Sequence, residues 1–156
     1  MRVLTVAGPA VARPGNYIVP IGTPLRFLLE QVGARSSAKE VILGGPMMGQ
    51  AQANLDAPVV KGTTGVVVLE KHETRLEKVY PCIHCGRCLE ACPVFLNPSL
   101  LGDLARVARY DAMTDQHLAD CMLCGSCAYV CPSNIPLAQL FQASKAALRR
   151  VKAGAA

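Results

Sequence analysis

The 156-residue sequence contains no tryptophan, and its aromatic content is only 4%. Proteins that bind single-stranded nucleic acid stack the bases on aromatic side chains, so this composition argues against that class of function. No apolar run reaches the roughly 18 residues that a membrane-spanning helix needs. The apolar N-terminal stretch is broken at Gly8-Pro9, which argues against a cleaved signal peptide. We therefore expect a folded chain without a transmembrane segment of its own.

Two catalytic patterns are also missing. No G-x-G-x-x-G motif stands between a predicted strand and a predicted helix, so a Rossmann dinucleotide site is not expected. No nucleophile with a matching base can be identified in the sequence. These absences argue against a complete hydride-transfer or acyl-transfer enzyme.

Cysteine is what the sequence does contain, eight in all, confined to two short repeats. Residues 82–93 read CIHCGRCLEACP, and residues 121–132, 39 positions later, read CMLCGSCAYVCP. Both fit C-x2-C-x2-C-x3-C-P with a glycine after the second cysteine. Such regular spacing indicates metal ligation in a reducing compartment, not a secreted disulfide framework. We therefore expect a cytoplasmic protein.

This spacing is typical of proteins that hold two [4Fe-4S] clusters. Each iron of such a cluster needs one thiolate, and three closely spaced cysteines surround one cluster while the fourth reaches the neighbouring one. The glycine allows a close backbone approach, and the proline turns the chain away from the site. The predicted ligands of the first cluster are Cys82, Cys85, Cys88 and Cys131. The predicted ligands of the second cluster are Cys92, Cys121, Cys124 and Cys127.

The residues alone leave alternatives to iron–sulfur clusters open. Two zinc sites of four cysteines each would use the same thiolates, although zinc sites usually pair two separated C-x2-C units. Disulfides are a further alternative. The formal charge of +5 counts every cysteine as neutral. Two four-iron clusters of roughly −2 each would cancel most of it, so a basic nucleic-acid surface is not inferred.

The cysteine-free first part predicts a small α+β domain at residues 1–70. Runs rich in β-branched residues predict strands at 2–8, 16–22, 40–45 and 65–71. Residues 23–33 predict one helix with Thr23 as N-cap, Pro24 at the first helical position and Gly33 beyond its end. The order strand, strand, helix, strand, strand resembles a β-grasp domain.

A charged linker is expected at residues 71–80, followed by a mostly helical ferredoxin-like domain at residues 81–156. Two segments there carry apolar residues at helical spacing. In the first segment these residues are Leu100, Leu101, Leu104, Val107 and Ala108. In the second they are Leu137, Leu140, Phe141, Leu148 and Val151.

Other candidate residues admit two interpretations each. The GGPMMG segment at 44–49 is either a loop that approaches a ligand or partner, or a tight turn with core methionines. His84 and Arg87 either tune a cluster or face solvent. Four basic residues near the C-terminus either stabilise the end of a helix or dock onto an acidic partner or a lipid surface, and we favour the first interpretation. These residues are Lys145, Arg149, Arg150 and Lys152.

Together the motifs carry a specific family resemblance. The segments TVAGPAVARPGNYIVPIGTPLRFLLEQVG, VILGGPMMGQA, VVKGTTGVVVL and CGSCAYVCPSNIPL resemble the C-terminal part of the C subunit of the Rnf complex, a membrane-bound, ion-translocating ferredoxin:NAD+ oxidoreductase. The resemblance runs from about residue 2 to 152. It implies a β-grasp domain of the soluble-ligand-binding (SLBB) type, followed by a domain with two [4Fe-4S] clusters.

The resemblance also implies a function. We expect an electron-transfer module, peripheral to the cell membrane on its cytoplasmic face, that works with the other subunits of a membrane redox complex, a flavin-bearing subunit and ferredoxin. FMN and NAD(H) are expected only on an N-terminal domain absent from this chain, or on a partner. The sequence is then either a fragment or a stand-alone short homologue. The alternative is a cobalamin-reductase-type subunit, or a ligand-binding module with structural clusters.

One departure from the family pattern lies in CPVFLNP after Cys92. Phe95 stands where a small residue is common, and we interpret it as a change of packing.

Overall fold

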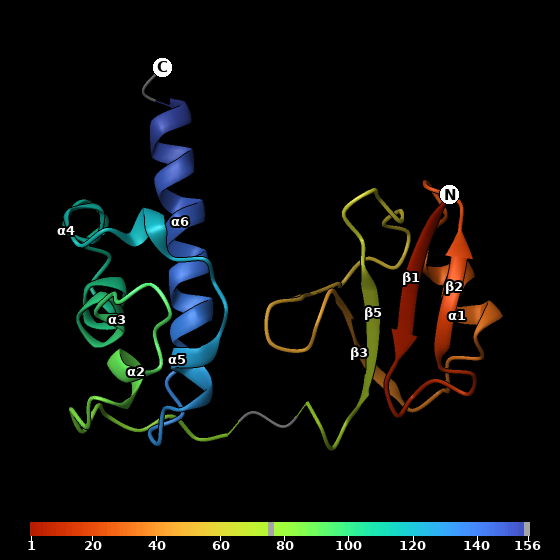
Figure 1. Ribbon diagram of the computed structural model, residues 1–156, viewed down its shortest axis with the longest axis horizontal. Helices are drawn as coiled ribbons and strands as arrows, with labels where there is room; N and C mark the ends of the chain where they lie inside the picture. Colours follow the sequence, from red (N-terminus) through yellow and green to blue (C-terminus); the bar gives the residue numbers. More distant parts are fainter. Residues whose placement is uncertain (75–76, 155–156) are drawn as a thin grey trace. The chain divides into compact units, whose positions relative to one another are not determined.

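The computed structural model describes residues 1–74 and 77–154, except for the side chain of Lys152. The chain divides into two compact units, Met1–Leu76 and Glu77–Ala156. The first contains a five-stranded sheet with one helix, and the second is helical (Figure 1). The expected α+β class is therefore confirmed. Part of the expected charged linker, residues 75–76, lies outside the described residues. No described helix combines the length and apolarity needed to cross a membrane.

The sheet of the first unit is mixed, with strand order β2-β1-β5-β3-β4. Strand β1 (Arg2–Ala7) runs antiparallel to β2 (Gly15–Val19) and parallel to β5 (Gly65–Glu70). Strand β3 (Ala38–Leu43) runs antiparallel to β5 and to the short β4 (Gln50–Ala51). The four longer strands lie close to where the sequence predicts them. Strand β4 was not predicted, because two residues carry no periodic signal.

Helix α1 (Leu25–Gln31), the one helix that residues 1–74 form, packs its apolar side onto the sheet. Leu25, Leu28 and Leu29 are buried against strand residues such as Val6 and Val66. Burial of each leucine stabilises the unit by about 1.5–3 kcal/mol. The alternation of buried and exposed residues along β1 follows from this single covered face.

The two ends of α1 differ in how well the sequence predicted them. Thr23 is not the N-cap, because Pro24 takes that position and the Thr23 hydroxyl donates to the carbonyl of Pro20. Gly33 ends the helix as predicted, with φ +71°. The backbone N–H groups after the helix bond back onto its last turn, Gly33 to Glu30 and the next residue to Leu29, in a Schellman motif.

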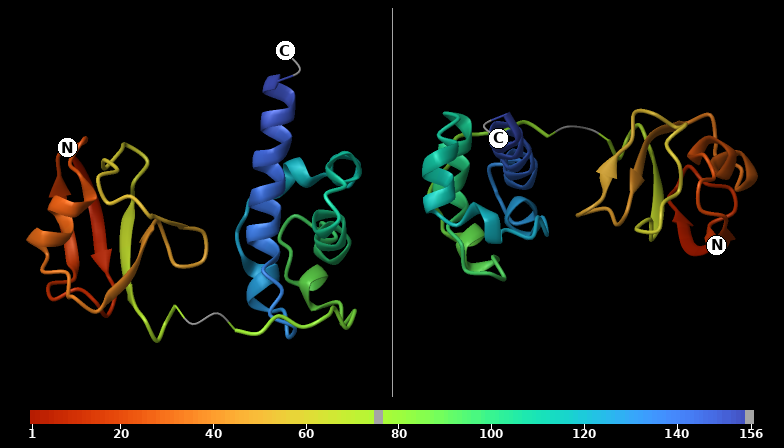
Figure 2. Two further views of the ribbon diagram at one scale, coloured as in Figure 1. Left: turned by 180° about the vertical axis from the view of Figure 1, so that it is seen from behind. Right: turned by 90° about the horizontal axis from the view of Figure 1, so that it is seen from above.

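The described residues of the second unit, 77–154, form five α-helices and one short 3-10 helix. Their bounds are α2 Arg87–Glu90, α3 Pro98–Arg106, α4 Tyr110–Asp115, η1 Leu118–Asp120, α5 Ser126–Tyr129 and α6 Leu137–Gly154. Helices α3 and α4 pack against the long helix α6, as both views in Figure 2 show. These three helices contribute to a second apolar core, which includes Leu101, Met113 and Phe141.

Helix α3 is shorter than its apolar pattern predicts. Val107 and Ala108 were expected on its buried face, but the helix ends at Arg106 and Val107 is 66% exposed. The reason is a Schellman ending in which Ala108 adopts φ +54° and its N–H donates to the carbonyl of Ala105. Val151 of α6, also expected on a buried face, is 65% exposed.

We predict that Gly8→Ala destabilises the first unit by about 3 kcal/mol. Gly8 follows β1 at φ +120°, and a Cβ there would lie 2.1 Å from the carbonyl oxygen of Val68. Strain at positive φ costs about 1–2 kcal/mol, and overpacking adds about 1–3 kcal/mol. Denaturant unfolding followed by circular dichroism measures this loss.

Gly22→Ala is the matched control. Gly22 has φ +96° and nothing within 4 Å of its Cβ position, so we expect only the strain, about 1 kcal/mol. Equal losses in the two variants would contradict the role given to the Val68 carbonyl.

Candidate iron–sulfur site

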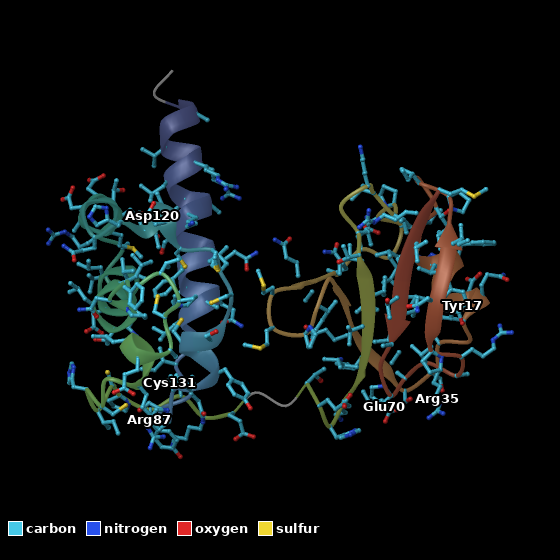
Figure 3. All side chains as sticks on the ribbon, in the orientation of Figure 1. Tyr17, Arg35, Glu70, Arg87, Asp120 and Cys131 are labelled. Atoms are coloured by element: carbon cyan, nitrogen blue, oxygen red, sulfur yellow. The ribbon has the colours of Figure 1, made fainter. Side chains whose placement is uncertain are left out.

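The cysteines of the second unit surround two hollows. The first hollow is lined by Cys82, Cys85, Cys88 and Cys131. The second hollow is lined by Cys92, Cys121, Cys124 and Cys127. Figure 3 shows several sulfur atoms among the helices of this unit and labels Cys131. The last cysteine of each repeat thus lines the hollow of the other repeat. These are the two groups of four that the spacing predicts as ligand sets, and iron ligation itself stays a prediction.

The backbone follows the same path around both hollows. The residue before the second cysteine has positive φ in each repeat, +53° at His84 and +56° at Leu123. The glycine after that cysteine does so too, +78° at Gly86 and +82° at Gly125. Non-glycine residues are strained at such angles and keep them only where the surroundings impose them. The glycines adopt them without that penalty, which explains their place in the motif.

Several hydrogen-bond donors lie close to the cysteine sulfurs. The backbone N–H of His84 donates to Cys82 Sγ at 3.4 Å, and that of Leu96 to Cys92 Sγ at 3.4 Å. Ser126 Oγ lies 3.5 Å from Cys124 Sγ. Hydrogen bonds to sulfur stabilise thiolates and influence the potential of iron–sulfur sites. The donor environment therefore fits sulfur ligands of a cluster.

The pKa values of three thiols are shifted by burial, by neighbouring cysteines and by hydrogen bonding. Burial raises the pKa of Cys127 to about 11, with the charge of Cys121 as the next cause. Burial also raises the pKa of Cys88, helped by the charges of Cys131, Cys82 and Cys85. The pKa of Cys124 is lowered by its hydrogen bond with Ser126. Binding of a metal centre must displace the protons of these thiols.

Three hydrogen bonds hold the start of the first repeat against the end of the second. The N–H of Tyr80 donates to the carbonyl of Ser133 at 2.9 Å, and Ser133 Oγ donates to the carbonyl of Pro81 at 2.9 Å. Asn134 Nδ2 donates to the carbonyl of Lys78 at 3.2 Å. These bonds bring Cys131 to the first hollow. Sequence reasoning did not identify Ser133 and Asn134, because no local pattern marks them.

The two hollows differ in their walls. Cys85 of the first hollow is exposed, whereas Cys127 of the second is buried. The second hollow is lined by Phe141, while the first has Gly102 at the equivalent repeat position. A Cβ on Gly102 would lie 2.6 Å from the side chain of Leu137, so the glycine allows α3 to approach α6. The first hollow is thus the more accessible of the two.

The other candidates from the sequence are placed as follows. His84 lines the first hollow and is exposed, and Arg87 is exposed. Phe95 is 93% exposed, so its interpretation as a packing change was wrong. Its backbone has φ +54°, close to the +52° of Asn134 at the equivalent repeat position.

The GGPMMG segment forms a tight connection between β3 and β4. Gly44 has φ +109°, and the N–H of Gly49 donates to the carbonyl of Gly45 at 2.7 Å. Of the two interpretations, the tight turn agrees with this geometry, but Met47 and Met48 are 51% and 60% exposed and are not core residues.

Lys145 lies in the middle of α6 and not at its end, contrary to the helix-end interpretation. Its Nζ donates to the carbonyl of Ala119 at 2.9 Å and to that of Cys121 at 2.5 Å. Sequence reasoning missed this contact. No local pattern marks it, because Lys145 and Cys121 are 24 residues apart.

All eight cysteines are free thiols, so a disulfide framework is not formed. Within residues 1–74 and 77–154, no three His, Cys, Asp or Glu side chains converge closely enough to hold a single metal ion. The four thiols of each group instead line a hollow.

Comparison with known proteins gives two family matches. Residues 3–51 match the model of the SLBB domain, and residues 77–135 match that of the 4Fe-4S dicluster domain. The second match includes both cysteine repeats.

Three relatives among the curated proteins are C subunits of translocating oxidoreductase complexes. The chain is 42% identical over 117 residues to the C subunit of the proton-translocating ferredoxin:NAD(+) oxidoreductase complex of Clostridium ljungdahlii, covering 74% of this chain and 26% of the relative. It is 42% identical over 148 residues to the C subunit of the ion-translocating oxidoreductase complex of Rhodobacter capsulatus, covering 94% and 28%. The corresponding C subunit of Salmonella gallinarum is 44% identical over 155 residues, covering 97% and 23%. The chain thus spans about a quarter of the length of these relatives.

Pairs of cysteine substitutions test the grouping. We predict that Cys82→Ala with Cys131→Ala retains about four irons per chain, because both changes fall on one four-iron cluster. Cys82→Ala with Cys92→Ala is expected to lose nearly all iron, since it removes one ligand from each cluster. Iron analysis of anaerobically purified protein measures both.

The opposite pattern would show that each repeat ligates its own cluster with all four cysteines. The two double variants remove the same number of thiols, so each serves as the control for the other.

Proposed function

Because the chain belongs to the family of C subunits of ion-translocating oxidoreductase complexes, we propose that it is an electron-transfer module of such a complex. Its eight cysteines hold two [4Fe-4S] clusters, which pass single electrons to one another. The observation that carries this proposal is the pair of hollows, each surrounded by four free thiols drawn from both repeats. The match to the 4Fe-4S dicluster domain supports it independently.

The ligand sets follow from the two groups of thiols. Cys82, Cys85, Cys88 and Cys131 would hold one cluster. Cys92, Cys121, Cys124 and Cys127 would hold the other. The exposed Cys85 makes the first set the side at which electrons are exchanged with a partner, since the second set contains the buried Cys127.

The domain organisation is part of the same proposal. Residues 1–70 form a β-grasp domain of the soluble-ligand-binding type, 71–80 a charged linker and 81–156 a ferredoxin-like domain. The adjacent parallel strands β1 and β5, the single helix α1 on one face of the sheet and the SLBB match at residues 3–51 support the first assignment. The two compact units support the division of the chain.

The chemistry at either end of the electron path lies outside these residues in our proposal. FMN and NAD(H) would be bound by another domain or by a partner subunit, and ferredoxin is a further partner. The names of the relatives, which describe ion-translocating complexes and, in one case, a ferredoxin:NAD(+) oxidoreductase, support this placement. We propose that the chain works at the cytoplasmic face of the membrane, where the first unit docks onto other subunits.

Electron paramagnetic resonance tests the electron-transfer role. We predict that anaerobic protein contains about eight irons per chain and that dithionite reduction produces two interacting [4Fe-4S] signals. The signals should interact because the predicted clusters share both cysteine repeats. A colourless protein with stoichiometric zinc would exclude the proposal, and clusters that no accessible reductant reduces would assign them a structural role.

Removal of the metal should unfold the second unit selectively. Its apolar core contains Cys127, and Cys82, Cys88, Cys121 and Cys131 pack against it. Oxidation with chelation leaves these thiols without their metal, and the stability that metal binding supplies is lost. We expect circular dichroism to lose most of its helical signal while the signal of the sheet remains. Helices that survive complete removal of iron would show that the second core suffices.

A further inference from the structure

The sequence repeat extends beyond the cysteines to a basic residue. Arg106 follows Cys82 by 24 positions, and Lys145 follows Cys121 by the same 24 positions. Both basic residues lie on the helix that follows their repeat, α3 and α6 respectively. The structure places the two basic residues in different environments.

Lys145 is fixed beside the second hollow. Its Nζ lies 2.5 Å from the carbonyl oxygen of Cys121, which lines that hollow, and 2.9 Å from that of Ala119. The side chain is half-buried, and its two acceptors are neutral. The ion pairs among the described residues do not include Lys145. A positive charge that no ion pair of these residues engages is therefore held at the backbone of a predicted ligand.

Arg106 provides a weaker counterpart at the first hollow. It lines that hollow together with Asp103, and both side chains are exposed to solvent. The charge of a guanidinium that is exposed to water is screened strongly. The equivalent basic residue thus contributes little field at the first hollow.

This difference has a consequence for one-electron reduction. Each reduction adds one electron and makes the site one unit more negative. A fixed positive charge stabilises that added electron, and the effect is larger in a partly buried environment. The charge and hydrogen bonding around a cluster are among the factors that set its potential.

We propose that Lys145 is a positioning residue that raises the reduction potential of the site at Cys92, Cys121, Cys124 and Cys127 above that at the other four cysteines. An electron that enters at the exposed first site then comes to rest at the second. This inference rests on the proposed function, since it requires clusters at both sites.

The test compares four variants of the full chain by redox titration with dithionite, followed by electron paramagnetic resonance. Lys145→Gln retains a donor for the carbonyls and removes the charge. We expect it to lower the equilibrium constant of the first reduction about tenfold, equivalent to about 59 mV for one electron. Lys145→Arg retains the charge and is expected to stay within about twofold of wild type. Arg150→Gln, an exposed position on the same helix, and Arg106→Gln are expected to change the first reduction less than about twofold.

Iron content separates failure of this inference from failure of the proposed function. Wild-type protein without iron–sulfur clusters overturns the proposed function. Fully loaded variants in which Lys145→Gln titrates like wild type overturn the role of Lys145 alone. Loss of iron from Lys145→Gln but not from Lys145→Arg also overturns the role in setting the potential, and assigns Lys145 to holding the ligand loop. An equal shift in Arg150→Gln would show that net charge, and not the position of Lys145, sets the potential.

Discussion

Convergence of four thiols from two separate stretches of chain is the constraint on which the second unit depends. Burial, together with the charges of neighbouring cysteines, raises the pKa of Cys127 to about 11 and also raises that of Cys88, which favours the protonated thiols. Hydrogen bonds from Ser133 and Asn134 hold the two ends of the repeat region together. Metal ligation displaces the thiol protons, and the thiolates then share positive centres. Cluster binding and folding of this unit are therefore one process in our proposal.

The duplicated motif gives the two sites the same backbone and different surroundings. Equivalent residues adopt the same positive φ angles in both repeats. The side chains that follow diverge, with Gly102 at the first hollow and Phe141 at the second. The exposure of the cysteines differs too, because Cys85 at the first hollow is exposed and Cys127 at the second is buried. In our proposal, two similar clusters in these different environments have different potentials, which gives the electron relay a direction.

The first unit has a core of its own and does not depend on the cysteines. Its strands and α1 enclose buried residues such as Leu4, Val66 and Val68. The chain spans only about a quarter of its curated relatives, so the unit acts in our proposal within a larger assembly. The fold of this unit is therefore independent of metal in our proposal.

The sequence by itself determined the local features of this protein. Cysteine spacing predicted the two groups of thiols, and Gly33 predicted the end of α1, because each depends on the conformation of a few neighbouring residues. Only the tertiary structure decided the contacts of Lys145, Ser133 and Asn134, which join residues 24 to 56 positions apart. Such pairs leave no periodic signal, because their geometry is set by how the helices pack. The early end of α3 was hidden for a related reason: an alanine at positive φ is imposed by its surroundings and not by its own preference.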